Sequence, residues 1–256
     1  MFLNCHSWFS FHYGTLSIEK LLEEAQRLGV RKLVLTDINN TSGVLDFIRL
    51  APKYGVEPVV GIEFRQGDDV RFIGIAKNNE GFEELNRFLS ECLRTGAREG
   101  ESSGNRDAII PEKIPCFRNV VVIIPVALSA PNSSSSEEAL PAGAVTRGSQ
   151  PEAIRLKPAA LPLQATGLKP EANRRKPEAN SIFYGIRPSD LSRLPFSPYK
   201  HLLHRCVILW PVTVRHKTDF NVHRLLCAIG HNTLLSKVPP EVNCSPDEIM
   251  TTEAEV

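Results

Sequence analysis

Short apolar runs alternate with amphipathic segments over the first 95 residues of the chain. Each apolar run has the length of a buried strand; the runs are residues 3–7, 32–36, 59–62 and 70–76. Each amphipathic segment carries apolar residues at helical spacing; these segments are residues 18–28, 47–50 and 80–93. The alternation predicts an α/β fold with a mainly parallel sheet or a barrel.

Local signals set the ends of the first elements. Ser17 suits an N-cap, Glu19 lies in the positive first turn of the helix, and Gly29 fits the position just after it. Asp37 and Glu63 stand where the second and third strands are predicted to end. In such folds functional side chains gather at the C-terminal ends of strands, so both carboxylates are candidate site residues.

The composition changes sharply over residues 129–181. Four serines at 133–136 are followed by prolines at 141, 151, 158, 162, 170 and 177, and a short Pro-Glu-Ala unit recurs. Few large apolar residues are available to offset the entropy of ordering this run. We expect a long disordered insertion, with a docking tail for a partner as the alternative. The chain then divides into 1–128, the insertion 129–181, and 182–256.

Regular structure is predicted to resume after the insertion. Order is expected from residues 182–188 onward, residues 205–210 read as a strand, and Asp219 is predicted to cap a helix. Ser245 and Glu248 have capping-box spacing, so another helix is expected to begin there. A helix of two turns is rarely a natural domain end. We therefore expect the sequence to be the front part of a longer protein, or a truncated version of one.

Composition and charge are those of an ordinary globular domain. Of the 256 residues, 42% are hydrophobic and 23% are charged, and the net charge is +1. A net charge this close to zero favours neither nucleic acid nor a membrane surface as a binding partner. The N-terminus lacks the basic and apolar regions of a signal peptide, and the six cysteines lie far apart without a C-x-x-C pair. A cytoplasmic protein with free thiols is the expectation.

Five local patterns stand together in order along the chain. They are N-C-H-S-W-F-S at 4–10, L-T-D-I-N-N at 35–40, G-V-E-P-V-V-G-I-E-F at 55–64, A-K-N-N-E-G-F at 76–82 and K-T-D-F-N-V-H-R-L-L at 217–226. Together they resemble the PHP domain that opens bacterial DNA polymerase III alpha subunits. There the motifs read H-x-H-S-x-x-S, L-T-D-H, G-I-x-P-I-x-G-x-E, A-K-N-x-x-G-Y-x-N-L and D-F-x-x-H. The resemblance covers residues 1–95 and 182–256.

The resemblance implies a distorted (β/α)7 PHP barrel. In active members the strand ends hold up to three metal ions bound by His, Asp, Glu and Cys, and these ions activate water against a phosphoester. Carried over residue by residue, His6 matches the second His of the first motif, Asp37 the Asp of the second, and Glu63 the Glu of the third. These three are the candidate, vestigial metal ligands.

The remaining positions depart from the family pattern. Asn4 and Ile38 stand where the family carries histidines, and Arg71 lies near another such position. Residues 211–214 replace the late N-D-V-H motif. Three ligands are too few to offset the mutual repulsion of several metal ions. We therefore expect no cofactor, with one weakly held Mn, Zn or Mg ion and a working trinuclear site as alternatives.

Each candidate also has an ordinary structural interpretation. His6 could bond to backbone near a strand end, Asp37 could cap the turn at 39–43, and Glu63 could pair with Arg65 or Arg71. Four further histidines favour structural or surface positions rather than a metal, namely His201, His204, His216 and His223. Cys5 favours the core over a nucleophile, because no adjacent relay can be identified.

The resemblance implies a role in DNA replication. The intact subunit is a DNA-directed DNA polymerase, a nucleotidyltransferase, but no paired-aspartate palm motif occurs here, so this chain alone is not expected to polymerise. We expect a non-catalytic module that contacts the rest of the alpha subunit and replicase subunits such as the proofreading exonuclease. It would meet DNA only through the intact polymerase. The alternatives are a metal-dependent phosphoesterase or 3′–5′ exonuclease using His6, Asp37 and Glu63, and a free-standing PHP phosphatase.

Overall fold

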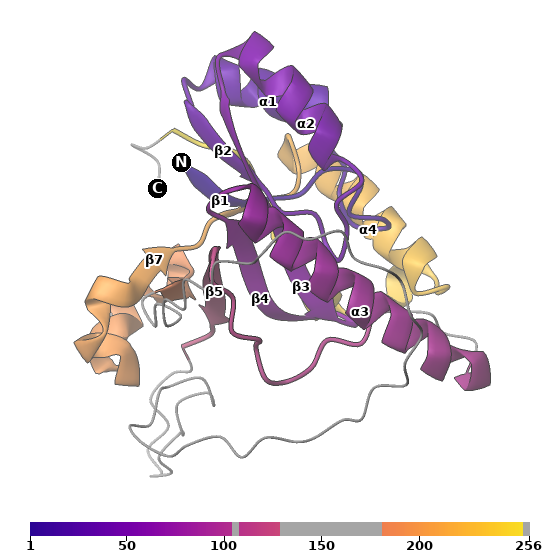
Figure 1. The fold of residues 1–256 in the computed structure, drawn as a ribbon. Helices are drawn as coiled ribbons and strands as arrows, with labels where there is room; N and C mark the ends of the chain where they lie inside the picture. The colour runs from indigo at the N-terminus through magenta and orange to yellow at the C-terminus, as the bar shows by residue number, and fades with distance from the viewer. Residues whose placement is uncertain (104–107, 129–180, 253–256) are drawn as a thin grey trace, which may run out of the picture.

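The computed structural model describes residues 1–103, 108–128 and 181–252 (Figure 1). The predicted disordered insertion lies outside the described residues, except for its last residue, Ser181. Ser181 is buried, and its hydroxyl accepts a hydrogen bond from Lys77 Nζ at 2.6 Å. The described chain therefore resumes one residue before the predicted boundary.

Within the described residues, eight strands form one sheet in the order β7-β6-β5-β4-β3-β2-β1-β8. The strands are β1 (Phe2–Cys5), β2 (Lys32–Leu35), β3 (Glu57–Gln66), β4 (Asp69–Ala76), β5 (Val120–Val126), β6 (Ile182–Ile186), β7 (Cys206–Ile208) and β8 (Pro211–Val212). Only Leu209 and Trp210 separate β7 from β8, although these strands form opposite edges of the sheet. One continuous segment thus joins the two edges and curls the sheet.

Apolar side chains fill the inside of this curled sheet. Strands from across the sheet contribute to a single cluster, which contains Leu3, Val34, Val59, Ile73, Ile75, Val121, Ile123, Phe183, Val207 and Leu209. A packed interior of alternating strand residues is typical of a small barrel. If β7 and β8 are taken as one interrupted strand, the sheet has seven members. The predicted α/β fold and distorted (β/α)7 architecture are confirmed.

The distortion comes from β4, which runs antiparallel to both β3 and β5. A tight turn at Gly67, with φ of +59°, connects β3 to β4. β3 pairs with β2 through residue 60 and with β4 from residue 61 onward. The prediction that this strand ends at Glu63 is therefore wrong, because a second partner takes up its backbone groups and extends it to Gln66.

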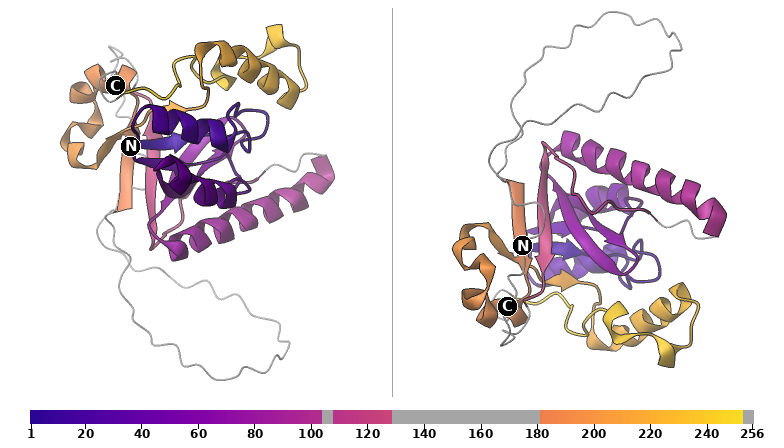
Figure 2. Two further views of the ribbon diagram at one scale, coloured as in Figure 1. Left: turned by 90° about the horizontal axis from the view of Figure 1, so that it is seen from above. Right: turned by 90° about the horizontal axis from the view of Figure 1, so that it is seen from below.

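Helices cover the outside of the sheet (Figure 2). They are α1 (Ile18–Arg27), α2 (Val44–Leu50), α3 (Asn79–Ser103) and α4 (Phe220–Gly230). The 3-10 segments are η1 (Ala51–Tyr54), η3 (Pro188–Phe196), η4 (Pro198–His201), η5 (Leu203–Arg205), η6 (Lys217–Asp219), η7 (Leu235–Lys237) and η8 (Pro240–Val242). Ser17 caps α1 by accepting from Lys20 N at 3.2 Å, and Gly29 follows with φ of +69°, as predicted. No helix within the described residues is long and apolar enough to span a membrane.

The helix predicted to begin at Ser245 does not form within the described residues 245–252. The Ser245 carbonyl accepts from Glu248 N at 3.0 Å, which closes a single turn. The Glu248 carbonyl then accepts from Thr213 N at 2.9 Å and from Val214 N at 3.2 Å. This long-range pairing uses a carbonyl that a helix would need, so capping-box spacing alone gave the wrong prediction.

Candidate functional site

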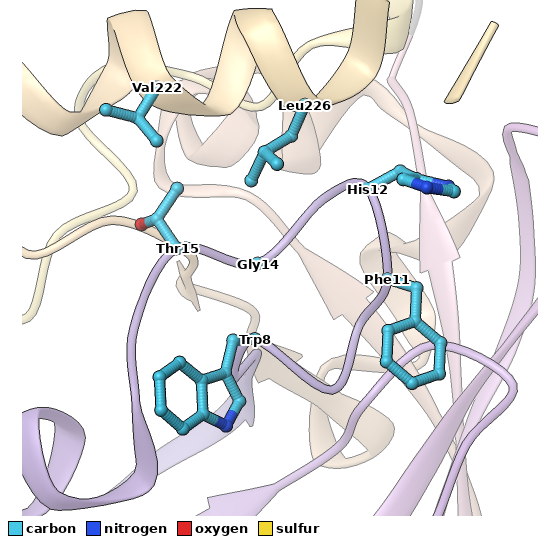
Figure 3. A pocket seen from close by; sticks show the side chains of 7 residues that line it. All are labelled: Trp8, Phe11, His12, Gly14, Thr15, Val222 and Leu226. Carbon is cyan, nitrogen blue, oxygen red and sulfur yellow. The ribbon is translucent and has the colours of Figure 1, made fainter. Parts of the chain in front are cut away.

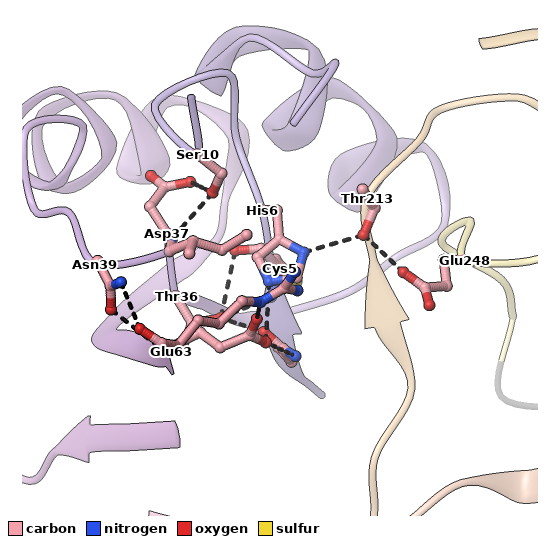
Figure 4. A network of polar contacts seen from close by, with 12 residues as sticks. Cys5, His6, Ser10, Thr36, Asp37, Asn39, Glu63, Thr213 and Glu248 are labelled. Carbon is pink, nitrogen blue, oxygen red and sulfur yellow. Dashed lines mark hydrogen bonds and ion pairs between the residues drawn. The ribbon is translucent and has the colours of Figure 1, made fainter. Parts of the chain in front are cut away.

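The three predicted site residues come together at one end of the curled sheet (Figure 4). His6 follows β1, Asp37 lies just beyond β2, and Glu63 lies within the adjacent β3. Each is about 1% exposed. The parallel pairing of β1, β2 and β3 brings their corresponding ends together, as the sequence predicted. Their hydrogen bonds nevertheless divide them into two separate groups.

Glu63 is the centre of the first group. Its Oε2 accepts from Asn4 Nδ2 at 2.6 Å and lies 3.2 Å from His6 Nε2, while its Oε1 accepts from Arg65 Nε. Burial by itself raises the pKa of this carboxyl. The Arg65 charge, His6 and the Asn4 amide outweigh burial and hold the Glu63 pKa well below its usual range.

Arg65 is held on several sides. It shares a face of β3 with Glu63, because successive strand residues alternate between faces. Its guanidinium carbon lies 4.2 Å from the centre of the Tyr13 ring, a cation–π geometry. The Asn39 side chain fixes its backbone, accepting from Arg65 N at 3.0 Å and donating to Arg65 O at 2.8 Å. Of the two partners considered for Glu63, the structure places Arg65 against it.

His6 connects this group to the C-terminal segment. Its Nδ1 lies 3.0 Å from Thr213 Oγ1, and that hydroxyl donates to Glu248 Oε2 at 2.8 Å. Both ring nitrogens of His6 therefore face side chains, so the interpretation that the His6 side chain bonds to backbone is wrong. Sequence reasoning missed Thr213 and Glu248 as site residues, because Thr213 lies in the segment that lacks the family's late ligand motif and Glu248 lies in a capping-box pattern.

Asp37 forms the second group. Its Oδ1 accepts from Ser7 N at 2.7 Å and from Ser10 Oγ at 2.7 Å, and its Oδ2 accepts from Ser7 Oγ at 2.8 Å. Burial raises the Asp37 pKa despite these three bonds. The prediction that Asp37 caps the turn at 39–43 is wrong. In that turn Ser42 N donates to Asn40 Oδ1 instead.

These contacts decide how well the site fits a metal cluster. All four carboxylate oxygens of Asp37 and Glu63 already accept hydrogen bonds from protein groups, and the permanent cation Arg65 lies against one of them. Over the described ranges, no group of three His, Cys, Asp or Glu side chains is arranged to hold a metal ion. The donor set therefore does not fit the multinuclear cluster that the resemblance implies.

The other histidines take structural or surface positions. His201, His204 and His216 are exposed. His223 in α4 is fully buried and lies 2.7 Å from the Tyr13 carbonyl through Nδ1, while Nε2 accepts from Cys244 N at 2.9 Å. Only a neutral ring with its proton on Nδ1 satisfies both partners.

We expect the stability of the fold to decrease as the pH falls below about 6.5, the ordinary pKa of histidine. Burial lowers the pKa of folded His223, so the unfolded chain binds more protons in this range and acid favours unfolding. His223 contributes fully to stability at pH values above the pKa that it has in the unfolded chain. This contribution is lost as the pH falls toward the lower pKa that His223 has in the folded protein. Urea unfolding from pH 5 to pH 8 measures it.

The matched variant for this measurement is His223→Gln, which has no titrating ring. His231 acts in the opposite direction, because its hydrogen bond to Asp68 raises its pKa, so wild type and variant must be compared at each pH. An equal loss of stability in both proteins would contradict the assignment to His223.

We call the end of the sheet that carries His6, Asp37, Glu63 and Arg65 the rim. A shallow apolar hollow of about 520 Å³ lies beside it (Figure 3). The hollow is lined by Trp8 and Phe11 from the loop after β1 on one side and by Val222 and Leu226 of α4 on the other, with the backbone of that loop between them. Trp8 is 54% exposed and Phe11 68%. Two further apolar residues of α4, Leu225 and Ile229, are exposed on the same helix, although they do not line the hollow. We call these six residues the Trp8–α4 surface.

Comparisons with known proteins locate the relationship in the N-terminal part of the chain. The PHP domain family model matches residues 3–113. An error-prone DNA polymerase of Symbiobacterium thermophilum is 35% identical over 109 residues, covering 43% of this chain and 10% of that protein. A DNA polymerase III subunit alpha of Ureaplasma parvum is 30% identical over 120 residues, covering 47% of this chain and 12% of that protein.

Among solved structures, an amidohydrolase from Chromobacterium violaceum aligns with a TM-score of 0.30 and 21% identity, over 41% of this chain and 40% of that one. The chain spans only about a tenth of the length of the curated polymerases that it matches. The matched region contains the strand ends that carry His6, Asp37 and Glu63. The N-terminal part of this chain is a PHP domain, related to those of error-prone DNA polymerases and DNA polymerase III alpha subunits.

Proposed function

We propose that this PHP domain acts as a non-catalytic structural and docking module of a polymerase III-type replicase. The observation that carries the proposal is that each oxygen of the two rim carboxylates already accepts a hydrogen bond from a protein donor. The carboxylates of Asp37 and Glu63 are buried and hydrogen-bonded to protein donors, and Arg65 neutralises Glu63. A water-activating metal needs vacant ligand positions on such carboxylates. The rim instead ties β1, β2, β3 and the C-terminal segment together.

The Trp8–α4 surface supplies the docking face. Large exposed apolar patches on soluble proteins commonly mark interaction sites. Trp8 is well suited as an anchor, because tryptophans dominate binding energies at protein interfaces. About nine tenths of each relative lies outside the segment that it shares with this protein. We assign this surface to the polymerase region of such a protein, and any contact with DNA passes through that region.

The assignment is tested by binding to the polymerase region encoded in the same genome, purified without its own PHP segment. We expect Trp8→Ser and Leu225→Ser to weaken binding at least about tenfold, as loss of an interface anchor does. Phe196→Ser is the matched control, because Phe196 is 82% exposed on η3, outside the Trp8–α4 surface. Calorimetric titration gives the dissociation constants.

Three results would contradict the assignment. Binding could be absent, or all three variants could weaken it equally. Alternatively, wild type could form dimers in light scattering that Trp8→Ser converts to monomers, which would make a second copy of the chain the occupant. A proofreading exonuclease added in place of the polymerase region tests the other partner that the family resemblance implies.

A metal-dependent phosphoesterase or exonuclease is the second candidate. The 3.2 Å contact between His6 Nε2 and Glu63 favours it, because an imidazole and a carboxylate side by side are a common start for a metal site. Metal analysis of the purified protein separates the two functions. Mn or Zn near one equivalent, lost on Asp37→Ala, would support the enzyme and contradict the non-catalytic module.

A further inference from the structure

The Glu63 carboxylate is a buried anion that needs a compensating charge. A carboxylate removed from water is strongly disfavoured unless a cation or several donors neutralise it. Asn4 and His6 supply hydrogen bonds to Oε2, and Arg65 bonds to Oε1. Of these three partners, Arg65 is the one whose side chain is charged at every physiological pH.

The guanidinium is held in place from several sides. The β3 backbone delivers it to the same face as Glu63, the Tyr13 ring covers it at 4.2 Å, and only 10% of its side chain is exposed. Asn39 fixes the backbone of Arg65 through two hydrogen bonds. The side chain therefore has little freedom to swing away and leave Glu63 to another cation.

We infer that Arg65 is the resident cation of this rim: its guanidinium takes the electrostatic place of a divalent ion on Glu63 and excludes metal from the site. The inference rests on the proposed metal-free function and names the residue that enforces it. A divalent ion on Glu63 would lie next to a fixed positive charge, and the two would repel each other strongly in a buried site. Removing that charge frees Glu63 Oε1 for a metal beside the His6 imidazole.

The test measures the effect of 1 mM Mn²⁺ on Tm and on refolding yield, with bound Mn²⁺ counted by electron paramagnetic resonance. Wild type and Arg65→Lys, which keeps the charge, should neither bind Mn²⁺ nor gain stability. Arg65→Gln should melt at a lower temperature than wild type without Mn²⁺, recover when Mn²⁺ is added, and bind it at least about tenfold more tightly than wild type. Adding Glu63→Gln to Arg65→Gln should abolish the recovery.

The outcomes separate this inference from the proposed function. Stoichiometric Mn²⁺ in wild type would overturn the proposed function and the exclusion of metal together. A metal-free wild type with an Arg65→Gln protein that Mn²⁺ fails to stabilise would overturn the inference alone. If Arg65→Gln does not fold unaided, refolding from urea decides. Native circular dichroism recovered only with Mn²⁺ supports the inference, and no recovery with Mn²⁺ contradicts it.

Discussion

Replacing Arg65 by methionine is expected to lower the free energy of unfolding by about 3–5 kcal/mol at neutral pH. This is the typical cost of removing one partner from a buried ion pair. Methionine keeps much of the apolar packing of the arginine stem, so the loss reports mainly the charge. Glu63 would then be a buried carboxylate with Asn4 and His6 as its remaining partners. Chemical denaturation at equilibrium measures the change.

The double variant Glu63→Gln with Arg65→Met makes this result specific. It contains no uncompensated buried charge, so we expect it to lose less stability than the two single variants added together, by about 1 kcal/mol or more. The matched control is Arg87→Met, which removes an exposed ion pair with Glu83 and should change stability by less than about 1 kcal/mol. Equal effects at Arg65 and Arg87 would contradict the role given to the buried pair.

Gly14→Ala is expected to destabilise the fold by about 3 kcal/mol, the upper end of the range for overpacking. A Cβ on Gly14 would overlap the Ser7 carbonyl, and backbone atoms cannot move aside as a flexible side chain can. The loop after β1 would have to shift. That movement would break the bonds that Ser7 and Ser10 make to Asp37 and would displace Trp8.

Equilibrium unfolding and Trp8 fluorescence report the two parts of this effect. Gly67→Ala is the control, because Gly67 has open space around it and a φ of +59°. A left-handed conformation costs a non-glycine residue about 1–2 kcal/mol, so the control should lose less stability than Gly14→Ala and keep the emission of Trp8 unchanged. An equal loss of stability with unshifted fluorescence would show that the loop tolerates the added methyl group.

Local signals explain why much of the first 95 residues could be predicted. The Ser17 cap and the Gly29 stop act within one helix, and each strand before Glu63 is a compact apolar run. The gathering of His6, Asp37 and Glu63 also followed from strand order, since the ends of parallel strands meet. The Glu63–Arg65 pair was foreseeable as well, because residues two apart on a strand share a face.

Contacts between distant parts of the chain could not be predicted in this way. His6 lies against Thr213, 207 residues away, and no periodicity reports such a pairing. The backbone of Glu248 pairs with Thr213 and Val214, so the capping-box pattern at Ser245 was overridden by tertiary hydrogen bonding. β3 continues through Glu63 because β4 replaces β2 as its hydrogen-bonding partner. The length of this strand therefore depends on pairing within the sheet and not on the sequence of residues 59–63 alone.

Closure of the sheet by residues 206–212 has a consequence for synthesis of the protein on the ribosome. β8 is the partner of β1 along one side, yet it is translated about two hundred residues after β1. Until it emerges, the outer edge of β1 presents unpaired backbone groups, which can recruit strands of neighbouring nascent chains. Truncated chains that end before Val212 leave the outer edge of β1 unpaired. We expect such chains to be lost mainly by aggregation through this edge, and less by the loss of individual stabilising contacts.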